Sequence, residues 1–474
     1  MSSKPRRALL GAVLGALVGS VALTGCAATL IEGVATPESG ARADVAPADF
    51  PITGAADDDV DRAARNALAD LNTYWAEQFP GTFGQAYTPL TGGYFSVDPD
   101  DLDPARYPDG QIGCGQEIEA VIGNAFYCSA DPGSPDGDAI QYDRAFLGAL
   151  AFGTSSSEGY GRFIPALVMA HEFGHAVQAR VGYPIERSIN VETQADCFAG
   201  AWTAWVADGE APHDSIRPGE LDDVLRGYLL LRDPVGTGVG ASQAHGSYFD
   251  RVSAFQEGFD DGPVACRDSF GAERVFTQGR FSDQDLLTGG DAPYDQTQDL
   301  IGSTLPAFWT AVFQARGENF EPPQVQPFSR TAPDCGDDEP ATDLVWCAED
   351  ATVGYDETDL AQPVYAEFGD YAVLTAVSIP YALAAREQLG LSTDDEAAIR
   401  SAVCLTGAYT AAVLRDELPG ISISPGDVDE SVQFLLQSSN DPAVLDESGL
   451  TGFQLVDVFR GGVVEGLPAC DIGA

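Results

Sequence analysis

The chain has 474 residues and a formal net charge of −49, from 24 basic and 73 acidic residues. A surface this negative repels phosphate backbones, which argues against nucleic-acid binding, and it also opposes broad adhesion to anionic lipid. Hydrophobic residues make up 44% of the chain, so we expect a folded protein and not a disordered one. The length suits one large core or two domains of ordinary size.

The N-terminal segment has the pattern of a bacterial export signal. Basic residues precede an apolar stretch from Ala8 to Leu23, and Cys26 follows directly in a sequence that resembles a lipobox. A membrane-spanning helix is the alternative, but the apolar stretch is short for one. We therefore expect a lipoprotein signal peptide over residues 1–26, with Cys26 lipidated. A flexible Ala/Pro/Gly/Asp-rich tether over 27–55 would then hold the protein on the extracytoplasmic side of a cell membrane.

Two short strands are predicted ahead of the central motif. Residues 124–127 and 139–142 are rich in aromatic and apolar side chains and flank an Asp/Gly/Pro-rich stretch, as in two strands joined by a turn.

Residues 171–175, His-Glu-Phe-Gly-His, form the H-E-x-x-H pattern. On a helix, side chains four residues apart share one face, so His171 and His175 can bind a single metal ion. Apolar residues recur here with helical spacing, and Gly182 with a nearby proline provides an end. The chain has only 4 histidines, so two at this spacing indicate a zinc site and not a solvated pair. Glu172 would be the general base.

A hydrolytic zinc site needs a third protein ligand and an open position for water. Glu192 and Asp196 lie four residues apart on a second predicted helix, which places both on one face. We assign Glu192 as the third ligand. Asp196 would accept a hydrogen bond from the non-ligating ring nitrogen of a zinc-bound histidine and so fix its orientation. The reverse assignment, with Asp196 as the ligand, is the alternative.

Hydrolysis of a peptide also needs a donor for the oxygen that becomes negatively charged. His245 is our candidate, and Tyr248 and Arg251 are further candidates; a packed or solvated histidine is the alternative for His245. The remaining histidine, His213, lies in a Pro/Asp/Gly-rich stretch and is expected at the surface.

The cysteines indicate an internal duplication. Apart from Cys26 there are eight, an even number that suggests disulfides in an exported chain. Ser215–Gly219 recurs as Ser422–Gly426, and Cys197 recurs as Cys404, both 207 residues later (422 − 215). Matches that keep their order and spacing over this distance predict a tandem duplication. The matched cysteines are Cys114, Cys128, Cys197 and Cys266 in the first repeat and Cys335, Cys347, Cys404 and Cys470 in the second.

A duplicated unit should close its own disulfides. The short intervals suggest Cys114–Cys128 and Cys335–Cys347, which leaves Cys197–Cys266 and Cys404–Cys470. Other pairings within a repeat remain open, and the lack of C-x-x-C spacing disfavours metal binding by these cysteines.

The second repeat lacks the proposed chemistry. We expect a zinc peptidase domain over residues 56–290 and a degenerate, non-catalytic repeat over 291–474. One Zn²⁺ per chain follows, because only the first repeat retains ligands. The residues at the corresponding positions of the second repeat are Ile379, Pro380, Leu383, Ile399, Val403, Gly449 and Leu455.

Several longer motifs carry a family resemblance, and they span about a third of the chain. They are the Cys-Gly-Gln sequence at Cys114, Phe126–Cys128, the H-E-x-x-H helix ending in Val177–Gln178, Gln194–Gly200, and Ala244–Ser247 followed by Arg251. In these stretches the chain resembles the bacterial family of putative neutral zinc metallopeptidases. The resemblance implies a zincin-like α+β fold, mainly helical, with an active-site helix and a small β-sheet. It also implies peptide hydrolysis, with a peptide or protein as substrate.

Three functions fit these observations. The first is a membrane-anchored zinc peptidase, which we favour. The second is a non-catalytic envelope lipoprotein that binds partners through the duplicated domain. The third is a zinc hydrolase that acts on another amide, such as a cell-wall peptide bond.

Overall fold

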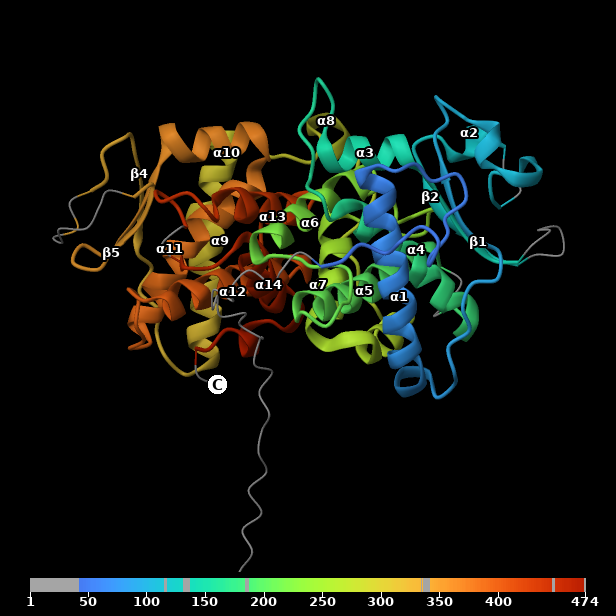
Figure 1. The fold of residues 1–474 in the computed structure, drawn as a ribbon. Helices are drawn as coiled ribbons and strands as arrows, with labels where there is room; N and C mark the ends of the chain where they lie inside the picture. Colours follow the sequence, from blue (N-terminus) through green and yellow to red (C-terminus); the bar gives the residue numbers. More distant parts are fainter. Residues whose placement is uncertain are drawn as a thin grey trace, which may run out of the picture. The chain divides into compact units, whose positions relative to one another are not determined.

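The computed structural model describes residues 42–114, 117–130, 137–183, 187–333, 335, 342–445 and 448–472, all within one compact unit (Figure 1). The expected signal peptide, Cys26 and the first part of the tether lie outside these residues. The domain boundary at residue 290 stays a prediction. We use it only to name a first half, up to residue 290, and a second half beyond it.

The first half combines helices with a three-stranded sheet. Strand β3 is central, with β1 parallel to it on one side and β2 antiparallel on the other, so β2 is an edge strand. The strands are β1 (Gly93–Val97), β2 (Ala125–Cys128) and β3 (Ala139–Asp143). The helices are α1 (Asp59–Phe83), α2 (Ile118–Val121), α3 (Arg144–Phe152), α4 (Ile164–Val181), α5 (Ser188–Ala207), α6 (Pro218–Leu231), α7 (Tyr248–Asp268) and α8 (Asp285–Thr288).

The second half has the same kind of sheet. Strand β6 is central, with β4 parallel and β5 antiparallel to it. The strands are β4 (Gln324–Phe328), β5 (Leu344–Cys347) and β6 (Thr352–Asp356). The helices are α9 (Tyr294–Ala315), α10 (Gln362–Glu367), α11 (Asp370–Gln388), α12 (Glu396–Leu414), α13 (Asp427–Ser438) and α14 (Gly452–Glu465). The predicted fold class, α+β and mainly helical, is confirmed.

The end of the expected tether is ordered. The Thr53 amide donates to the Tyr94 carbonyl, and Thr53 bridges to Phe95 in β1. Val45 and Ile52 are only 9% and 8% exposed. Composition alone placed these apolar residues in the tether, but they bury against the first half, so the tether ends before residue 55.

One hydrophobic core runs through both halves, and each half caps a helix of the other. Asp429 in α13 accepts from the first amides of α7, Tyr248 (3.2 Å) and Phe249 (2.9 Å). Asp222 in α6 accepts from the first amides of α14, Gly452 (3.1 Å) and Phe453 (2.7 Å). Because the first amides of a helix lack partners within it, the two carboxylates hold the halves in register.

Four disulfides form, two within each half, as the spacing predicts. Two of them join elements that are distant in the sequence. Cys197–Cys266 links α5 to α7, and Cys404–Cys470 links α12 to the chain after α14. The Cα atoms of the bonded pairs lie 5.9, 5.5, 5.0 and 5.2 Å apart for Cys114–Cys128, Cys197–Cys266, Cys335–Cys347 and Cys404–Cys470.

Helix α12 is the one described helix that is long and apolar enough to cross a bilayer. Its apolar window is 78% buried inside the protein. The apolar composition of α12 therefore serves packing in the core, as in many folded domains.

A buried carboxylate pair gives the fold a pH dependence that can be tested. Burial and the charge of Asp70 raise the pKa of Asp214 to about 8. The native state therefore holds a proton here that the unfolded state loses near pH 4, so this stability is lost as the pH rises from about 4 to about 8. We expect Asp214→Asn to stabilise the protein by at least about 1 kcal/mol more at alkaline pH than at pH 4. Urea unfolding at both pH values measures this; an equal effect at both would contradict it.

Candidate metal centre

Helix α4 presents the two histidines of the motif on one face. It begins at Ile164 with Pro165 in its first turn and ends at Val181, and the next residue, Gly182, has a positive φ of 93°. The His171 and His175 rings lie side by side, with centroids 4.8 Å apart, and each is partly exposed. The face that holds them is therefore open to a ligand.

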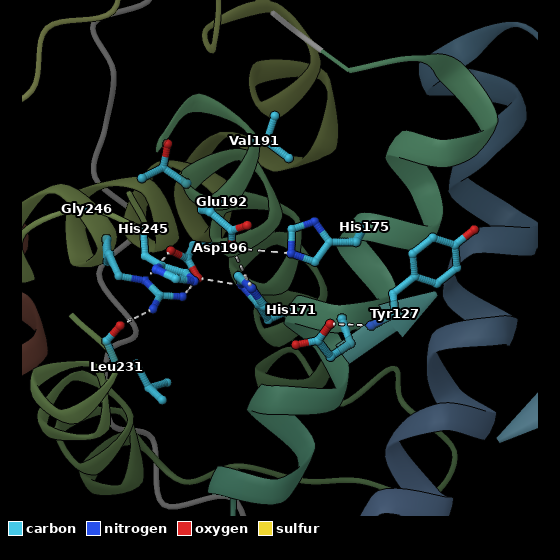
Figure 2. A network of polar contacts seen from close by, with 12 residues as sticks. Tyr127, His171, His175, Val191, Glu192, Asp196, Leu231, His245 and Gly246 are labelled. Atoms are coloured by element: carbon cyan, nitrogen blue, oxygen red, sulfur yellow. Dashed lines mark hydrogen bonds and ion pairs between the residues drawn. The ribbon is translucent and has the colours of Figure 1, made fainter. Parts of the chain in front are cut away.

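Helix α5 lies close enough to α4 to add a carboxylate. Gly174, between the histidines, packs directly against Ala195, because a Cβ at this glycine would lie 2.8 Å from the Ala195 Cα. This contact brings Glu192, one turn earlier on α5, over the histidine pair (Figure 2). The glycine in the motif is thus required for the approach of the two helices.

The three side chains converge with the spacing of a zinc site. Glu192 Oε2 lies 3.3 Å from His171 Nε2 and 3.4 Å from His175 Nε2. In a tetrahedral site with zinc bonds of about 2.0–2.1 Å, neighbouring ligand atoms are about 3.3–3.4 Å apart. Two imidazole nitrogens and one carboxylate oxygen are also a donor set that hydrolytic zinc sites use. The residues therefore fit a zinc ion.

Each histidine is oriented through its other nitrogen. His171 Nδ1 lies 2.8 Å from Asp196 Oδ1, and His175 Nδ1 lies 2.9 Å from Gln178 Oε1. Arg251 in turn donates to both Asp196 oxygens at 2.8 Å. Both rings thus keep Nε2 directed at Glu192. Such outer partners set ring orientation and strengthen metal binding.

The charges of the centre favour a cation. Burial lowers the pKa of His171, but the Asp196 and Glu192 carboxylates outweigh this and raise it to about 10. Burial raises the pKa of Glu192, yet both histidines hold it well below its usual range. The metal-free centre therefore holds protons between its ligands, and metal binding must release them.

Glu172 faces the same space but points away from the ligands. It is 6% exposed, and its Oε2 accepts from the Tyr127 amide of β2 at 2.8 Å. Burial raises its pKa, and the two histidines lower it by less. A buried carboxylate beside a metal centre, with a raised pKa, suits a group that takes up and gives back a proton.

A cleft of about 1270 Å³ opens over the centre. Its wall includes the β2 edge from Asn124 to Tyr127 and the ring of His245, whose side chain is 46% exposed. Asp233 Oδ1 lies 3.2 Å from His245 Nδ1 and Oδ2 accepts from the His245 amide at 2.8 Å. Asp233 thus fixes the ring and leaves Nε2 for the cleft.

The other candidate donors are engaged elsewhere. The Tyr248 hydroxyl donates to the Leu225 carbonyl at 2.9 Å, and Tyr248 is buried. Arg251 is 4% exposed and pairs with Asp196, so it positions the centre. His213 Nδ1 contacts the Ala43 carbonyl at 2.8 Å and does not line the cleft.

Three partners of the centre are not predicted from the sequence: Gln178, Asp233 and the Tyr127 amide. Gln178 carried a usable signal, because it follows His175 by three residues on one helix. Asp233 and the Tyr127 amide reach the centre only through the tertiary fold.

The Gly174 contact gives a prediction about metal binding. Gly174→Ala must push α5 away at Ala195, and this moves the flanking Glu192 and Asp196. We expect a loss of about 1–3 kcal/mol in unfolding free energy and weaker zinc binding. Urea unfolding and competition with a chromophoric chelator measure the two effects. Gly302→Ala, in α9, is the control and should keep both, because a Cβ there would meet no other part of the chain within 4 Å. Wild-type zinc affinity in Gly174→Ala would contradict the geometry.

The helix pair, the donor set and the adjacent glutamate define the class of H-E-x-x-H metal centres. Comparison with protein-family models identifies the family. Residues 5–270, more than half of the 474, match the family described as "putative neutral zinc metallopeptidase". The chain belongs to this family.

Its curated relatives are themselves named as uncharacterised. YpfJ of Escherichia coli K12 is 31% identical over 182 residues, which covers 34% of this chain and 58% of YpfJ. Rv2575 of Mycobacterium tuberculosis H37Rv is 26% identical over 191 residues, which covers 35% of this chain and 62% of Rv2575. The chain thus matches less than two thirds of the length of either relative. No solved structure matches it.

Proposed function

We propose that the protein is a zinc-dependent peptidase in which His171, His175 and Glu192 hold the ion and Glu172 is the general base. The observation that carries this proposal is the convergence of two Nε2 atoms on one carboxylate oxygen at 3.3 and 3.4 Å, with Glu172 beside them. The chemical reason is that this donor set leaves room for water and substrate at the metal.

Zinc, when bound, lowers the pKa of a water molecule and polarises the carbonyl of a peptide. The protein's own residues do the rest. The Glu172 carboxylate takes a proton from the attacking water and passes it to the leaving amine. The Tyr127 amide at 2.8 Å holds that carboxylate in place. His245, held by Asp233, is our candidate to donate to the developing oxyanion, which it does from Nε2 when its ring is protonated.

The edge of β2 is the proposed binding strand for the substrate. Tyr127 directs its amide away from β3 toward Glu172, and alternate residues of a strand present their backbone groups to the same side. Ala125 therefore offers an amide and a carbonyl to the cleft. An extended peptide could pair there by main-chain hydrogen bonds, with little demand on its side chains.

The second half is proposed to be a degenerate copy that supports the first. The two sheets share strand order and directions, and Asp222 and Asp429 make equivalent contacts 207 residues apart (429 − 222). The second copy has Ile379, Pro380 and Leu383 where the motif would fall. Through Asp429 it caps α7, the helix that carries Arg251.

The Asp196 contact supplies a test of how the centre is held. Asp196→Asn removes the charge that faces His171 and Arg251 and leaves a buried guanidinium unpaired. We expect zinc to be retained with affinity or activity reduced roughly 10–100-fold. Asp208→Asn, at the exposed end of the same helix, should be unchanged. Competition for zinc and kcat/KM are the measurements; wild-type values for Asp196→Asn would exclude the proposed role.

The location is proposed from the sequence: lipid on Cys26 would hold the enzyme on the outer face of the cell membrane, where peptides and proteins are its substrates. Incubation of the zinc-loaded chain with a peptide library, read by mass spectrometry, tests the activity. Cleavage that stops on chelation supports a peptidase. Zinc binding without cleavage favours the partner-binding lipoprotein, and cleavage of cell-wall amides alone favours the third function.

A further inference from the structure

Four acidic side chains of the second half meet outside the zinc centre. Asp291 precedes α9, Asp370 is the first residue of α11, and Asp427 and Glu430 lie in the first turn of α13. One carboxylate oxygen each from Asp291, Asp370 and Glu430 lies within 4.8 Å of the other two. Burial, and then the charges of Asp370 and Asp291, raise the pKa of Asp427 well above its usual range.

The hydrogen bonds around this cluster leave buried oxygens without partners. Glu430 Oε2 accepts from the Tyr371 amide at 2.8 Å, and Asp427 Oδ2 accepts from the Ser424 amide at 2.7 Å. In the described part of the chain, Oδ1 of Asp370 and Oδ1 of Asp427 are buried and have no partner. These two residues are only 6% and 4% exposed. Buried carboxylate oxygens of this kind normally have a donor or a cation.

The first half contains the same arrangement of backbone and acids. Gly161 and Gly369 precede α4 and α11, with positive φ of 97° and 128°. Each packs against an acid near the start of a neighbouring helix: a Cβ at Gly161 would lie 3.3 Å from Asp223 Oδ2, and one at Gly369 would overlap the Glu430 carboxylate. We call each of these places, where a glycine ahead of a helix packs against an acid of a neighbouring helix, a corner of the fold. The corners at Gly161 and Gly369 are equivalent.

The first half neutralises its corner with arginines. Arg162, directly after Gly161, donates to both Glu220 oxygens at 2.8 and 3.0 Å, and Arg217 adds a contact at 2.8 Å. Glu220 corresponds to Asp427. At the second corner, however, Arg162 is replaced by Asp370 and Arg217 by Ser424. Among the described residues, no arginine forms an ion pair with the four carboxylates.

We propose that Asp291, Asp370 and Glu430, with Asp427 beside them, bind one calcium ion, which replaces the arginines of the first half. All the ligands are oxygens, which calcium and magnesium prefer and zinc does not require. Calcium takes several carboxylate oxygens at once, whereas magnesium usually keeps several waters and binds through one or two carboxylates. The three carboxylate oxygens that meet here within 4.8 Å of one another therefore favour calcium.

Such an ion would fasten the segment before α9 to the starts of α11 and α13. We expect calcium to bind the zinc-loaded full chain with one site per chain in isothermal titration. It should raise the Tm by a few degrees once free calcium exceeds its Kd by about a hundredfold. Magnesium at the same concentration should give a smaller shift. His175→Ala should keep the calcium response, because the two centres are separate.

Variants make the test specific. Asp291→Asn, in a half-buried loop position, should weaken calcium binding at least tenfold, and Asp370→Arg should abolish it while pairing with Asp427 as Arg162 pairs with Glu220. Asp299→Asn, an exposed position on α9, should bind calcium as wild type does. If neither the wild type nor any variant binds calcium, and Asp370→Asn only stabilises the chain at alkaline pH, the carboxylates share protons and the proposal fails. Calcium binding that is unchanged in both Asp291→Asn and Asp370→Arg would equally overturn it.

Discussion

Glu172→Gln should bind zinc with the wild-type stoichiometry and cleave peptides about 10²–10⁴-fold more slowly. Glu172 points to the Tyr127 amide and not to the ligand cluster, so glutamine can keep this contact through its side-chain oxygen. Only the base is lost. Zinc content by atomic emission and kcat/KM on one peptide, measured on the same sample, separate the two roles.

Two controls bracket this result. Glu192→Gln replaces an anionic ligand by a neutral amide and should weaken zinc binding itself. Glu77→Gln, at an exposed position of α1, makes the same chemical change away from the site and should leave both quantities unchanged. Wild-type cleavage by Glu172→Gln would mean that the chain does not work as an H-E-x-x-H hydrolase.

His175→Ala should abolish zinc binding and with it all cleavage. The ring supplies one of three ligand atoms that lie within 4.8 Å of one another, and alanine leaves an incomplete site. The second half shares no ligand with the centre, so far-ultraviolet circular dichroism should stay close to that of the wild type. Measured zinc should fall from one ion per chain to none.

His213→Ala is the matched histidine control, because His213 contacts a backbone carbonyl outside the cleft. It should keep one zinc and full activity. Unchanged zinc in His175→Ala, or two zinc ions in the wild type, would show that the ligands are misassigned.

The convergence of the proposed ligands could be predicted from the sequence because it depends on spacing along single helices. His171 and His175 are one turn apart on α4, and Glu192 and Asp196 are one turn apart on α5. A helix fixes such relations locally, whatever surrounds it. The disulfide pairs were predictable for a related reason, since a repeated cysteine order limits the pairings.

Contacts between distant segments could not be predicted from the sequence. The caps that Asp222 and Asp429 provide across the halves, and the placement of Asp233 behind His245, depend on how helices and loops pack. The tether is another example: its composition predicts flexibility, yet Val45 and Ile52 are buried in the folded chain. The composition of a segment does not predict which surface of the protein the segment packs against.

The most direct test of the zinc-peptidase proposal is a titration of the metal-free chain with zinc while peptide cleavage is followed. Each chain should gain activity when its single site fills, so the rate should rise in proportion to added zinc and stop rising at one equivalent. Glu172→Gln should take up the same equivalent and stay at least about a hundredfold slower. Cleavage that does not depend on zinc, or a filled site that never cleaves a peptide, would contradict a zinc peptidase.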